Sequence, residues 1–102
     1  MSKIMSKSSE DHANFYEKYD TKNNISEPVM YKYEYTQIIG VRAQQIAEGS
    51  EPLIKVTKDL TNEVLIAEEE LRQRKTPFIL ERKITNTHTD YWKIEDLSID
   101  LL

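Results

Sequence analysis

The sequence contains no cysteine, only two glycines and three prolines, and no long apolar run. Without cysteine, the chain has no disulfide framework, no thiolate metal ligand and no cysteine nucleophile, which fits a reducing compartment. No segment approaches the roughly 20 apolar residues that span a bilayer. The N-terminal stretch MSKIMSKSSEDH lacks the apolar core of a secretory signal. We therefore expect a soluble, intracellular protein that does not bind membranes.

The sequence also lacks any recognisable group of catalytic or metal-binding residues. Its two histidines, His12 and His88, have no second ligand at a metal-binding spacing, and we expect both to be exposed. No GxGxxG, P-loop or GxSxG sequence occurs, and the chain has only two glycines. The carboxylate triplet Glu68, Glu69 and Glu70 has no partner His or Asp and is typical of a solvated helix face. We expect no catalytic residue, no metal and no cofactor, so the chain is not predicted to be an enzyme.

The charge argues against autonomous nucleic-acid binding. The formal net charge is −4, from 14 basic and 18 acidic residues that are interspersed along the chain. A free-standing nucleic-acid binder normally presents a basic face. If this protein works near DNA or RNA, we expect the contact to be indirect, through a partner.

Residues 1–28 are predicted to form a flexible N-terminal tail. Ser, Lys, Asn, Glu and Asp dominate this segment, and its apolar residues keep neither a helical nor a strand period. A short docking helix around Phe15, Tyr16 and Tyr19 is a weaker alternative. Residues 29–102 are predicted to form the folded domain.

The first predicted helix covers residues 33–48, where Tyr35, Ile38, Ile39, Arg42, Ala43 and Ile46 recur at the spacing of one helix face. Gly49 is placed as a left-handed C-terminal cap, and Pro52 prevents continuation. Gly40 lies inside this helix, where glycine costs about 1 kcal/mol relative to alanine. It is either a tolerated defect or a point where another backbone approaches closely, and the sequence leaves both open.

A second helix is predicted over residues 63–75, with Asn62 as its N-cap and an apolar stripe of Val64, Ala67 and Leu71. Acids precede bases along it, which predicts i, i+4 ion pairs between Glu68 and Arg72 and between Glu70 and Arg74. Pro77 ends this helix.

A β-hairpin is predicted to follow, with residues 78–84 and YWKI as its strands and TNTHTD as its turn. Trp92 in the returning strand is expected to pack in the core against the second helix. Arg82 is expected to meet a carboxylate on a protein partner. The predicted class is therefore α+β, with a disordered N-terminal tail, two helices and a C-terminal β-hairpin. A core this small stabilises a chain only modestly, which favours a subunit completed by a partner.

The stretch YKYEYTQIIGVRAQQIAEGSEPLI resembles the signature helix of the omega-type small subunit of multisubunit DNA-dependent RNA polymerases. The archaeal and eukaryotic members, the sixth subunit shared among the eukaryotic nuclear polymerases, are the most similar. Their pattern is matched here by Lys32, Tyr33, Glu34, Ile38, Ile39, Gly40, Arg42, Ala43, Gln45 and Pro52. The downstream residues Ile66, Ala67, Glu70, Leu71, Pro77, Phe78, Ile79, Leu80, Arg82, Asp90, Trp92, Glu95 and Leu97 also fit in order. The similarity covers residues 29–97.

The resemblance implies a non-catalytic subunit that clasps the largest, catalytic polymerase subunit and helps it to assemble. It implies that Gly40, Arg42, Ala43 and Gln45 face that subunit, with Arg42 and Gln45 donating hydrogen bonds. The other implied partner-binding residues are Lys32, Tyr33, Glu34, Ile39, Pro52, Arg82 and Trp92. No homo-oligomer is expected.

The chain departs from the family pattern at several positions. Tyr31 replaces the threonine that opens a capping box, although Glu34 can still reach the amide of residue 31. Gln37 replaces a usual arginine, and Thr85 to Thr89 replace a tight Pro-Asp-Gly turn. The tail is less acidic than in typical eukaryotic members, which leaves room for a homologue from a large DNA virus.

The main alternative function is a general α+β interaction adaptor outside the polymerase. The expected location depends on the source: the nucleus for a eukaryote, the cytoplasm for an archaeon, and the host cytoplasm or virion for a virus.

Overall fold

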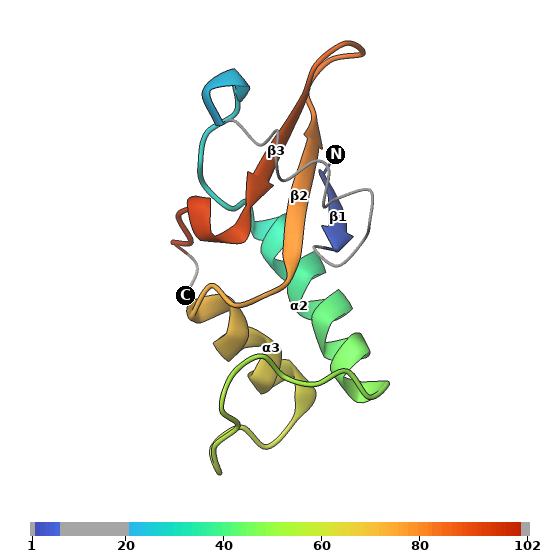
Figure 1. The fold of residues 1–102 in the computed structure, drawn as a ribbon, viewed down its shortest axis with the longest axis vertical. Coiled ribbons are helices and arrows are strands. Elements are labelled where there is room, and N and C mark those ends of the chain that lie inside the picture. Colours follow the sequence, from blue (N-terminus) through green and yellow to red (C-terminus); the bar gives the residue numbers. More distant parts are fainter. Residues whose placement is uncertain (1, 7–20, 101–102) are drawn as a thin grey trace. The chain divides into compact units, whose positions relative to one another are not determined.

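The computed structural model describes residues 2–6 and 21–100. They form two α-helices and a three-stranded antiparallel sheet, so the predicted α+β class is confirmed (Figure 1). The chain divides into two compact units. We call Met1–Val29 with Pro77–Ser98 the sheet unit, and Met30–Thr76 with Ile99–Leu102 the helix unit. The domain boundary predicted after residue 28 stays a prediction.

The helix unit is built on helix α2, Lys32–Ala47, which packs against helix α3, Glu63–Arg72. Helix α2 ends in a Schellman motif, in which Ser50 N–H donates to the Gln45 carbonyl and Gly49 N–H donates to the Ile46 carbonyl. Gly49 has a φ of 113°, which confirms its predicted role as a left-handed cap. The buried apolar side chains of the two helices are Ile38, Ile39, Ala43, Ala67 and Leu71.

Helix α3 is shorter than the sequence predicted. Its N-cap is confirmed, because the Asn62 side chain accepts a hydrogen bond from the Leu65 amide at 3.0 Å. The helix ends at Arg72 rather than Lys75, because Arg74 adopts a left-handed φ of 59° and turns the chain. The Lys75 amide then donates back to the Glu70 carbonyl at 2.9 Å, which closes the helix before Pro77 is reached.

The sheet unit contains the predicted hairpin. Strand β2, Phe78–Lys83, pairs with strand β3, Thr89–Lys93, in antiparallel register with Leu80 opposite Trp92. Ile84 and Thr85 amides both donate to the His88 carbonyl and close the turn. The returning strand starts earlier than predicted, and Ile94 instead begins a 3₁₀ helix, Ile94–Asp96.

A third strand was not predicted. Strand β1, Ser2–Ser6, pairs antiparallel with β2 and makes β2 the central strand of the order β1-β2-β3. Its sequence SKIMS has little strand propensity, so periodicity gave no signal. β1 forms by pairing with the backbone of β2, and the local sequence of residues 1–28 contains no information about that distant strand. The prediction of a tail without regular structure is therefore wrong for residues 2–6.

The segment before the helix unit is also held in place. After a 3₁₀ turn at Thr21–Asn23, the Asn24 side-chain amide accepts from the Tyr91 amide at 3.3 Å and donates to the Tyr91 carbonyl at 2.7 Å. Asn24 thus pairs with the outer edge of β3 as another strand would. Residues 24–28 depart from the predicted tail because side chains of the distant hairpin bind them. Phe15, Tyr16, Tyr19 and Leu101 to Leu102 lie outside the described residues.

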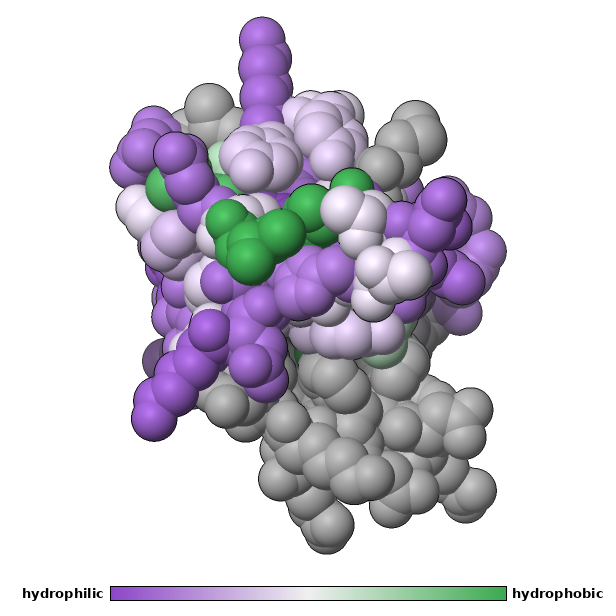
Figure 2. Space-filling view, turned by 90° about the horizontal axis from the view of Figure 1, so that it is seen from above, coloured by the Kyte–Doolittle hydropathy of each residue, from purple (hydrophilic) through white to green (hydrophobic). Residues whose placement is uncertain are grey.

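Several large apolar side chains are exposed in the described part of the chain. In the sheet unit they are Ile25 and Ile84, and in the helix unit they are Tyr33, Val41, Leu53, Val56 and Val64. Figure 2 shows one face of the molecule, where a narrow hydrophobic run is bordered by hydrophilic side chains. Across residues 2–6 and 21–100, no helix is both long and apolar enough to cross a membrane.

Candidate docking surface

The start of helix α2 is closed by Glu34. Its carboxylate accepts a hydrogen bond from the Tyr31 amide at 3.0 Å, although Tyr31 cannot cap the helix as the family threonine does. The expectation that Glu34 reaches the amide of residue 31 is confirmed. The rings of Tyr31 and Tyr33 are stacked, with centroids 6.2 Å apart. Glu34 is fully buried, so it positions the helix start rather than offering a charge to a partner.

The inner face of α2 carries a buried ion pair. Arg42 is 4% exposed, and its Nε donates to Glu70 Oε1 at 2.6 Å while Nη2 donates to Glu70 Oε2 at 3.0 Å. The same guanidinium donates to the Glu51 carbonyl and to Gln45 Oε1. Glu70 Oε2 also accepts from the Leu53 amide at 2.7 Å. This pair therefore connects α2, α3 and the connection that follows α2.

These contacts change the roles expected for several residues. Arg42 was expected to donate to the largest polymerase subunit, but four of its hydrogen bonds are made within the helix unit. Gln45 is half-buried and accepts from Arg42. Glu70 was expected on a solvated face in a pair with Arg74, and it is 0% exposed. The exposed ion pair of α3 is instead an i, i+3 contact between Arg72 and Glu69 at 2.8 Å.

The outer face of α2 carries no charge beyond its first residue. From Tyr33 onward, the exposed positions are Tyr33, Thr36, Gln37, Gly40, Val41, Gln44 and Ala47, which we call the α2 outer face. Its charged residues Glu34 and Arg42 both point inward and are buried. By contrast, the exposed positions of α3 include Glu63 and Arg72. In a chain that is 31% charged, an uncharged solvent-facing helix surface is a distinguishing feature.

Gly40 lies on this outer face with nothing near it. A Cβ atom added to Gly40 would have no neighbour within 4 Å, and the residue has ordinary helical backbone angles within α2. The described residues therefore contain no backbone that needs a glycine at this position. Of the two explanations that the sequence left open, a close approach to Gly40 by another backbone does not come from residues 2–6 and 21–100.

A shallow depression lies at the N-terminal end of the outer face. Lys32, Tyr33, Thr36 and Gln37 line a volume of about 630 Å³ that is open to solvent. The lining surface is almost entirely apolar, although three of the four residues are polar, because the stems of their side chains contribute it. Tyr33 is 49% exposed and Val41 is 37% exposed, so two larger apolar side chains flank Gly40 along the helix.

The remaining predicted partner-binding residues lie elsewhere. Ile39 and Ala43 are buried, and Pro52 is half-buried in the connection after α2. In the sheet unit, Arg82 is 3% exposed and donates to the carbonyls of Glu27 and Val29 at 2.8 and 2.6 Å. In this chain Arg82 holds the chain's own backbone, and the expected contact with a carboxylate on a partner stays a prediction.

Trp92 is also in the sheet unit and is 6% exposed, so the expectation that it is buried is confirmed. Its Nε1 donates to the Ser26 hydroxyl at 3.0 Å. That hydroxyl donates in turn to Asp90 Oδ2, which also accepts from the Ser26 amide at 2.6 Å, and His88 Nε2 lies 2.6 Å from Asp90 Oδ1. His88 is half-buried rather than exposed, because Asp90 holds its ring.

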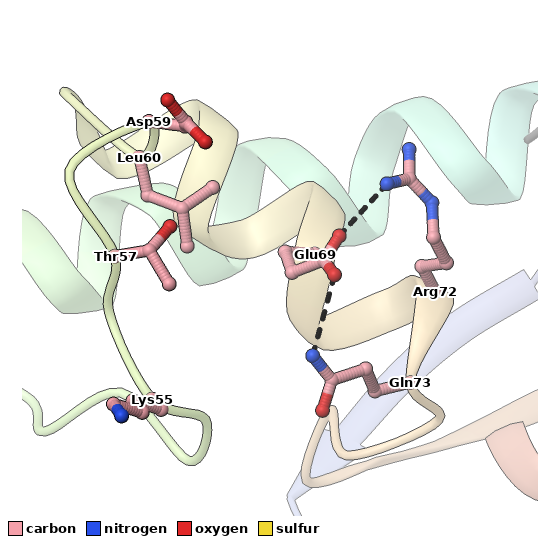
Figure 3. A pocket seen from close by; sticks show the side chains of 7 residues that line it. All are labelled: Lys55, Thr57, Asp59, Leu60, Glu69, Arg72 and Gln73. Atoms are coloured by element: carbon pink, nitrogen blue, oxygen red, sulfur yellow. Dashed lines mark hydrogen bonds and ion pairs between the residues drawn. The ribbon is translucent and has the colours of Figure 1, made fainter.

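A second depression lies beside α3 and has a mixed character. Figure 3 shows its lining, in which Glu69 bonds both Arg72 and Gln73 while Thr57 and Leu60 face it from the connection before the helix. The carboxylate of Glu69 is thus satisfied by the chain itself. No group of three or more metal-ligating side chains occurs in residues 2–6 and 21–100.

Sequence reasoning missed the structural roles of three polar residues: buried Glu70 in the helix unit, and half-buried Ser26 and buried Asp90 in the sheet unit. Glu70 was hidden in a run of glutamates, although its position four residues from Ile66 and one before Leu71 places it on the inner side of the helix. Ser26 carried no signal, because its partners are 56 to 66 residues away along the chain.

A family model described as RNA polymerase Rpb6 matches residues 24–78, which include the whole of α2 and α3. The chain belongs to this family. The match begins at Asn24, the residue that pairs with the edge of β3, so it includes the segment that the hairpin binds.

Curated relatives from three kinds of source agree with the Rpb6 family. The DNA-directed RNA polymerase subunit Rpo6 of Pyrobaculum aerophilum is 36% identical over 77 residues, which cover 74% of this chain and 73% of the relative. A probable DNA-directed RNA polymerases I, II, and III subunit RPABC2 of Caenorhabditis briggsae is 33% identical, covering 78% of this chain and 56% of the relative. Subunit 6 of the Acanthamoeba polyphaga mimivirus polymerase is 31% identical, covering 82% and 21%. The chain spans about half the length of the eukaryotic relatives.

Proposed function

We propose that this chain is a non-catalytic subunit of a DNA-dependent RNA polymerase, and that it docks on the largest subunit through the α2 outer face. Membership of the Rpb6 family supports the assignment to a polymerase. The names of the relatives describe them as subunits of DNA-directed RNA polymerases from a eukaryote, an archaeon and a virus. The chain contributes a binding surface, and the nucleotidyl transfer chemistry belongs to other subunits.

The uncharged α2 outer face is the observation that carries this proposal. The centres of protein interfaces are depleted of charged residues, because burying an unpaired charge is costly. A helix face that stays in water gains solubility from charge, and α3 follows that rule with Glu63 and Arg72. The α2 outer face is exposed to solvent, yet its residues are uncharged, as in the centre of a protein interface.

Gly40 adds a second argument for docking. A glycine inside a helix lowers helix stability by about 1 kcal/mol relative to alanine. Within the described residues nothing offsets that cost, since a Cβ at Gly40 would meet open space. A partner element that packs directly against the helix backbone at Gly40 explains why no side chain stands there.

The buried pair of Arg42 and Glu70 gives this surface its rigidity. By fixing α2 to α3 and to the Leu53 amide, the pair holds the outer face in one shape before binding. A preorganised surface loses less conformational entropy on association than a flexible one. Of the residues predicted to bind the partner, Lys32, Tyr33 and Gly40 border the proposed contact directly. Glu34, Ile39, Arg42 and Ala43 shape it from the buried side.

Co-purification tests the assignment. A tagged chain expressed in its native source should isolate the two large polymerase subunits at stoichiometric level. Isolation of the chain as a free monomer would overturn the proposal, and isolation with an unrelated protein would support the adaptor alternative. The location then follows from the polymerase: nuclear, cytoplasmic or viral according to the source.

A matched pair of valine variants tests the surface. Val41→Glu places a charge on the α2 outer face, and Val64→Glu places one at an exposed position on α3. We expect the Val41 variant to lose polymerase binding by at least tenfold and the Val64 variant to bind normally. Equal binding by both variants would show that the partner lies elsewhere.

A further inference from the structure

Strand β2 has the sequence of a central strand. Phe78, Ile79 and Leu80 are consecutive and all at most 1% exposed, so side chains on both faces of the strand are buried. Continuous apolar runs of this kind occur in strands that have a neighbour on each edge, whereas edge strands are shorter, more polar or protected by charge. β3 occupies one edge of β2, and the other edge, Phe78–Arg82, which we call the β2 edge, must also be covered.

The strand that covers the β2 edge fits it poorly. β1 has the sequence SKIMS, in which serine and lysine have little strand propensity. Ile4 and Met5 are only half-buried, whereas their register partners Leu80 and Ile79 are fully buried. The β1 side chains are therefore less buried than the β2 side chains with which they pair.

β1 and β2 are not joined as a hairpin, because both α-helices lie between them in the sequence. Once a partner has docked, an extended segment of that partner can pair with the β2 edge within the same complex. The length and stiffness of the chain that joins this segment to the docked part set its effective concentration at the edge. A partner strand can therefore compete with β1 once the chain is bound.

The opposite edge of the sheet is not available in this way. The Asn24 side chain makes two hydrogen bonds to Tyr91 on the outer side of β3. Arg82 binds the carbonyls of Glu27 and Val29 beside it, so several side chains hold that segment against the hairpin. The β2 edge is covered by β1, a strand of low strand propensity. Replacing β1 by another strand therefore requires less free energy than displacing the segment on the opposite edge.

We propose that the β2 edge is a strand-acceptor site, filled by residues 2–6 in the free chain and by an extended segment of the largest polymerase subunit after docking. This inference rests on the proposed function. The register describes the segment that fits: antiparallel, with small residues opposite Phe78 and Arg82, apolar residues opposite Ile79 and Leu80, and a basic residue opposite Glu81, where Lys3 stands now. Glu81 supplies the charge complementarity that selects the basic residue.

A disulfide lock tests the exchange, because the chain has no cysteine of its own. Lys3 and Glu81 are direct register partners, so the double variant Lys3→Cys with Glu81→Cys should form a disulfide that fixes β1 on the β2 edge. The control is Lys83→Cys with Thr89→Cys, a register pair that locks the hairpin and leaves β1 free. Both variants and the unmodified chain are added to polymerase depleted of this subunit, with and without dithiothreitol, and incorporation is followed over time.

We expect the β1-locked chain to incorporate at least tenfold more slowly under oxidising than under reducing conditions. The single variant Glu81→Cys, which loses the same charge without forming a lock, and the hairpin-locked chain should each incorporate at the same rate under both conditions. Equal incorporation of the two locked chains would overturn the strand proposal alone. Failure of the lock to form in the free chain would also overturn it, because β1 would not occupy the edge. If the unmodified chain does not incorporate, the proposed function fails, and the strand proposal fails with it.

Discussion

Arg42 and Glu70 form a buried ion pair with two hydrogen bonds, in which Nε lies 2.6 Å from Oε1 and Nη2 lies 3.0 Å from Oε2. One residue comes from the middle of α2 and the other from the third turn of α3. Two charges removed from water stay favourable only when each satisfies the other, and here the Leu53 amide and the Glu51 carbonyl complete the set. The pair therefore determines how the two helices meet.

Replacing Glu70 should destabilise the protein strongly. Glu70→Gln keeps the size of the side chain but leaves the buried Arg42 guanidinium without a counter-charge, which costs about 3–5 kcal/mol. The matched control is Glu69→Gln, which breaks the exposed pair with Arg72 and should cost less than about 1 kcal/mol. Urea unfolding followed by circular dichroism measures both. Similar losses in the two variants would mean that the buried pair has no special role.

The two glycines should respond to alanine in opposite directions. Gly40→Ala adds a Cβ in open space within a helix and should raise the free energy of unfolding by about 1 kcal/mol. Gly49→Ala forces an L-residue into a left-handed position at φ 113° and should lower it by about 1–2 kcal/mol.

Polymerase binding separates the roles of these glycines. If a partner packs against the backbone at Gly40, the Gly40 variant should be more stable when free and yet bind polymerase more weakly. A Gly40 variant that is stabilised and binds normally would show that no partner approaches this position. The same polymerase-binding measurement on the Gly49 variant should show only the loss expected from its lower stability.

The sequence was sufficient for the elements that local patterns encode. Helical periodicity and Asn62 and Gly49 as caps placed α2 and the start of α3, and alternating strands around a polar turn placed the hairpin. Strand β1 could not be predicted, since its residues favour no strand and its partner is more than 70 residues away.

Local sequence patterns also could not predict whether a charged side chain is buried or exposed. Arg42 and Glu70 lie in helices that are far apart in sequence, and each looked solvent-directed or partner-directed until the other was placed beside it. The uncharged outer face of α2 follows from that pairing, because a helix whose charges are satisfied inward presents a neutral surface outward. Within the proposed docking surface, Arg42 is buried in the chain's own core, whereas Gly40 and Tyr33 are exposed.

Acid should weaken the sheet unit through Asp90. Burial raises the pKa of the Asp90 carboxyl, but the hydrogen bonds from the Ser26 hydroxyl, the Ser26 and Ile25 amides and the His88 ring outweigh burial and hold the pKa below its ordinary value. A depressed folded-state pKa gives stability that is complete above the unfolded value, about 3.9, and is lost as the pH falls through the folded value.

Unfolding experiments at pH 7, 4 and 3 test that assignment with Asp90→Asn. Asparagine cannot ionise, so the difference in stability between the parent and the variant should be largest at pH 7 and should shrink below pH 4. His88 is the ionisable neighbour in direct contact, and His88→Gln removes its contribution for comparison. A difference that stays constant from pH 7 to pH 3 would exclude Asp90 as the titrating group.

Replacing Ser26 should destabilise the protein more than replacing an ordinary half-exposed serine. Its hydroxyl accepts from Trp92 Nε1 at 3.0 Å and from Arg82 Nη1 at 3.3 Å, and it donates to Asp90 Oδ2. Ser26→Ala leaves the buried indole N–H without that acceptor, which should cost about 1–3 kcal/mol. Trp92 is the only tryptophan, so its fluorescence reports the change directly. The exposed Ser50→Ala is the control and should stay within about 0.5 kcal/mol of the parent. Unchanged emission and stability in the Ser26 variant would show that the Ser26 hydroxyl does not help to hold the segment from Asn24 to Val29 on the hairpin.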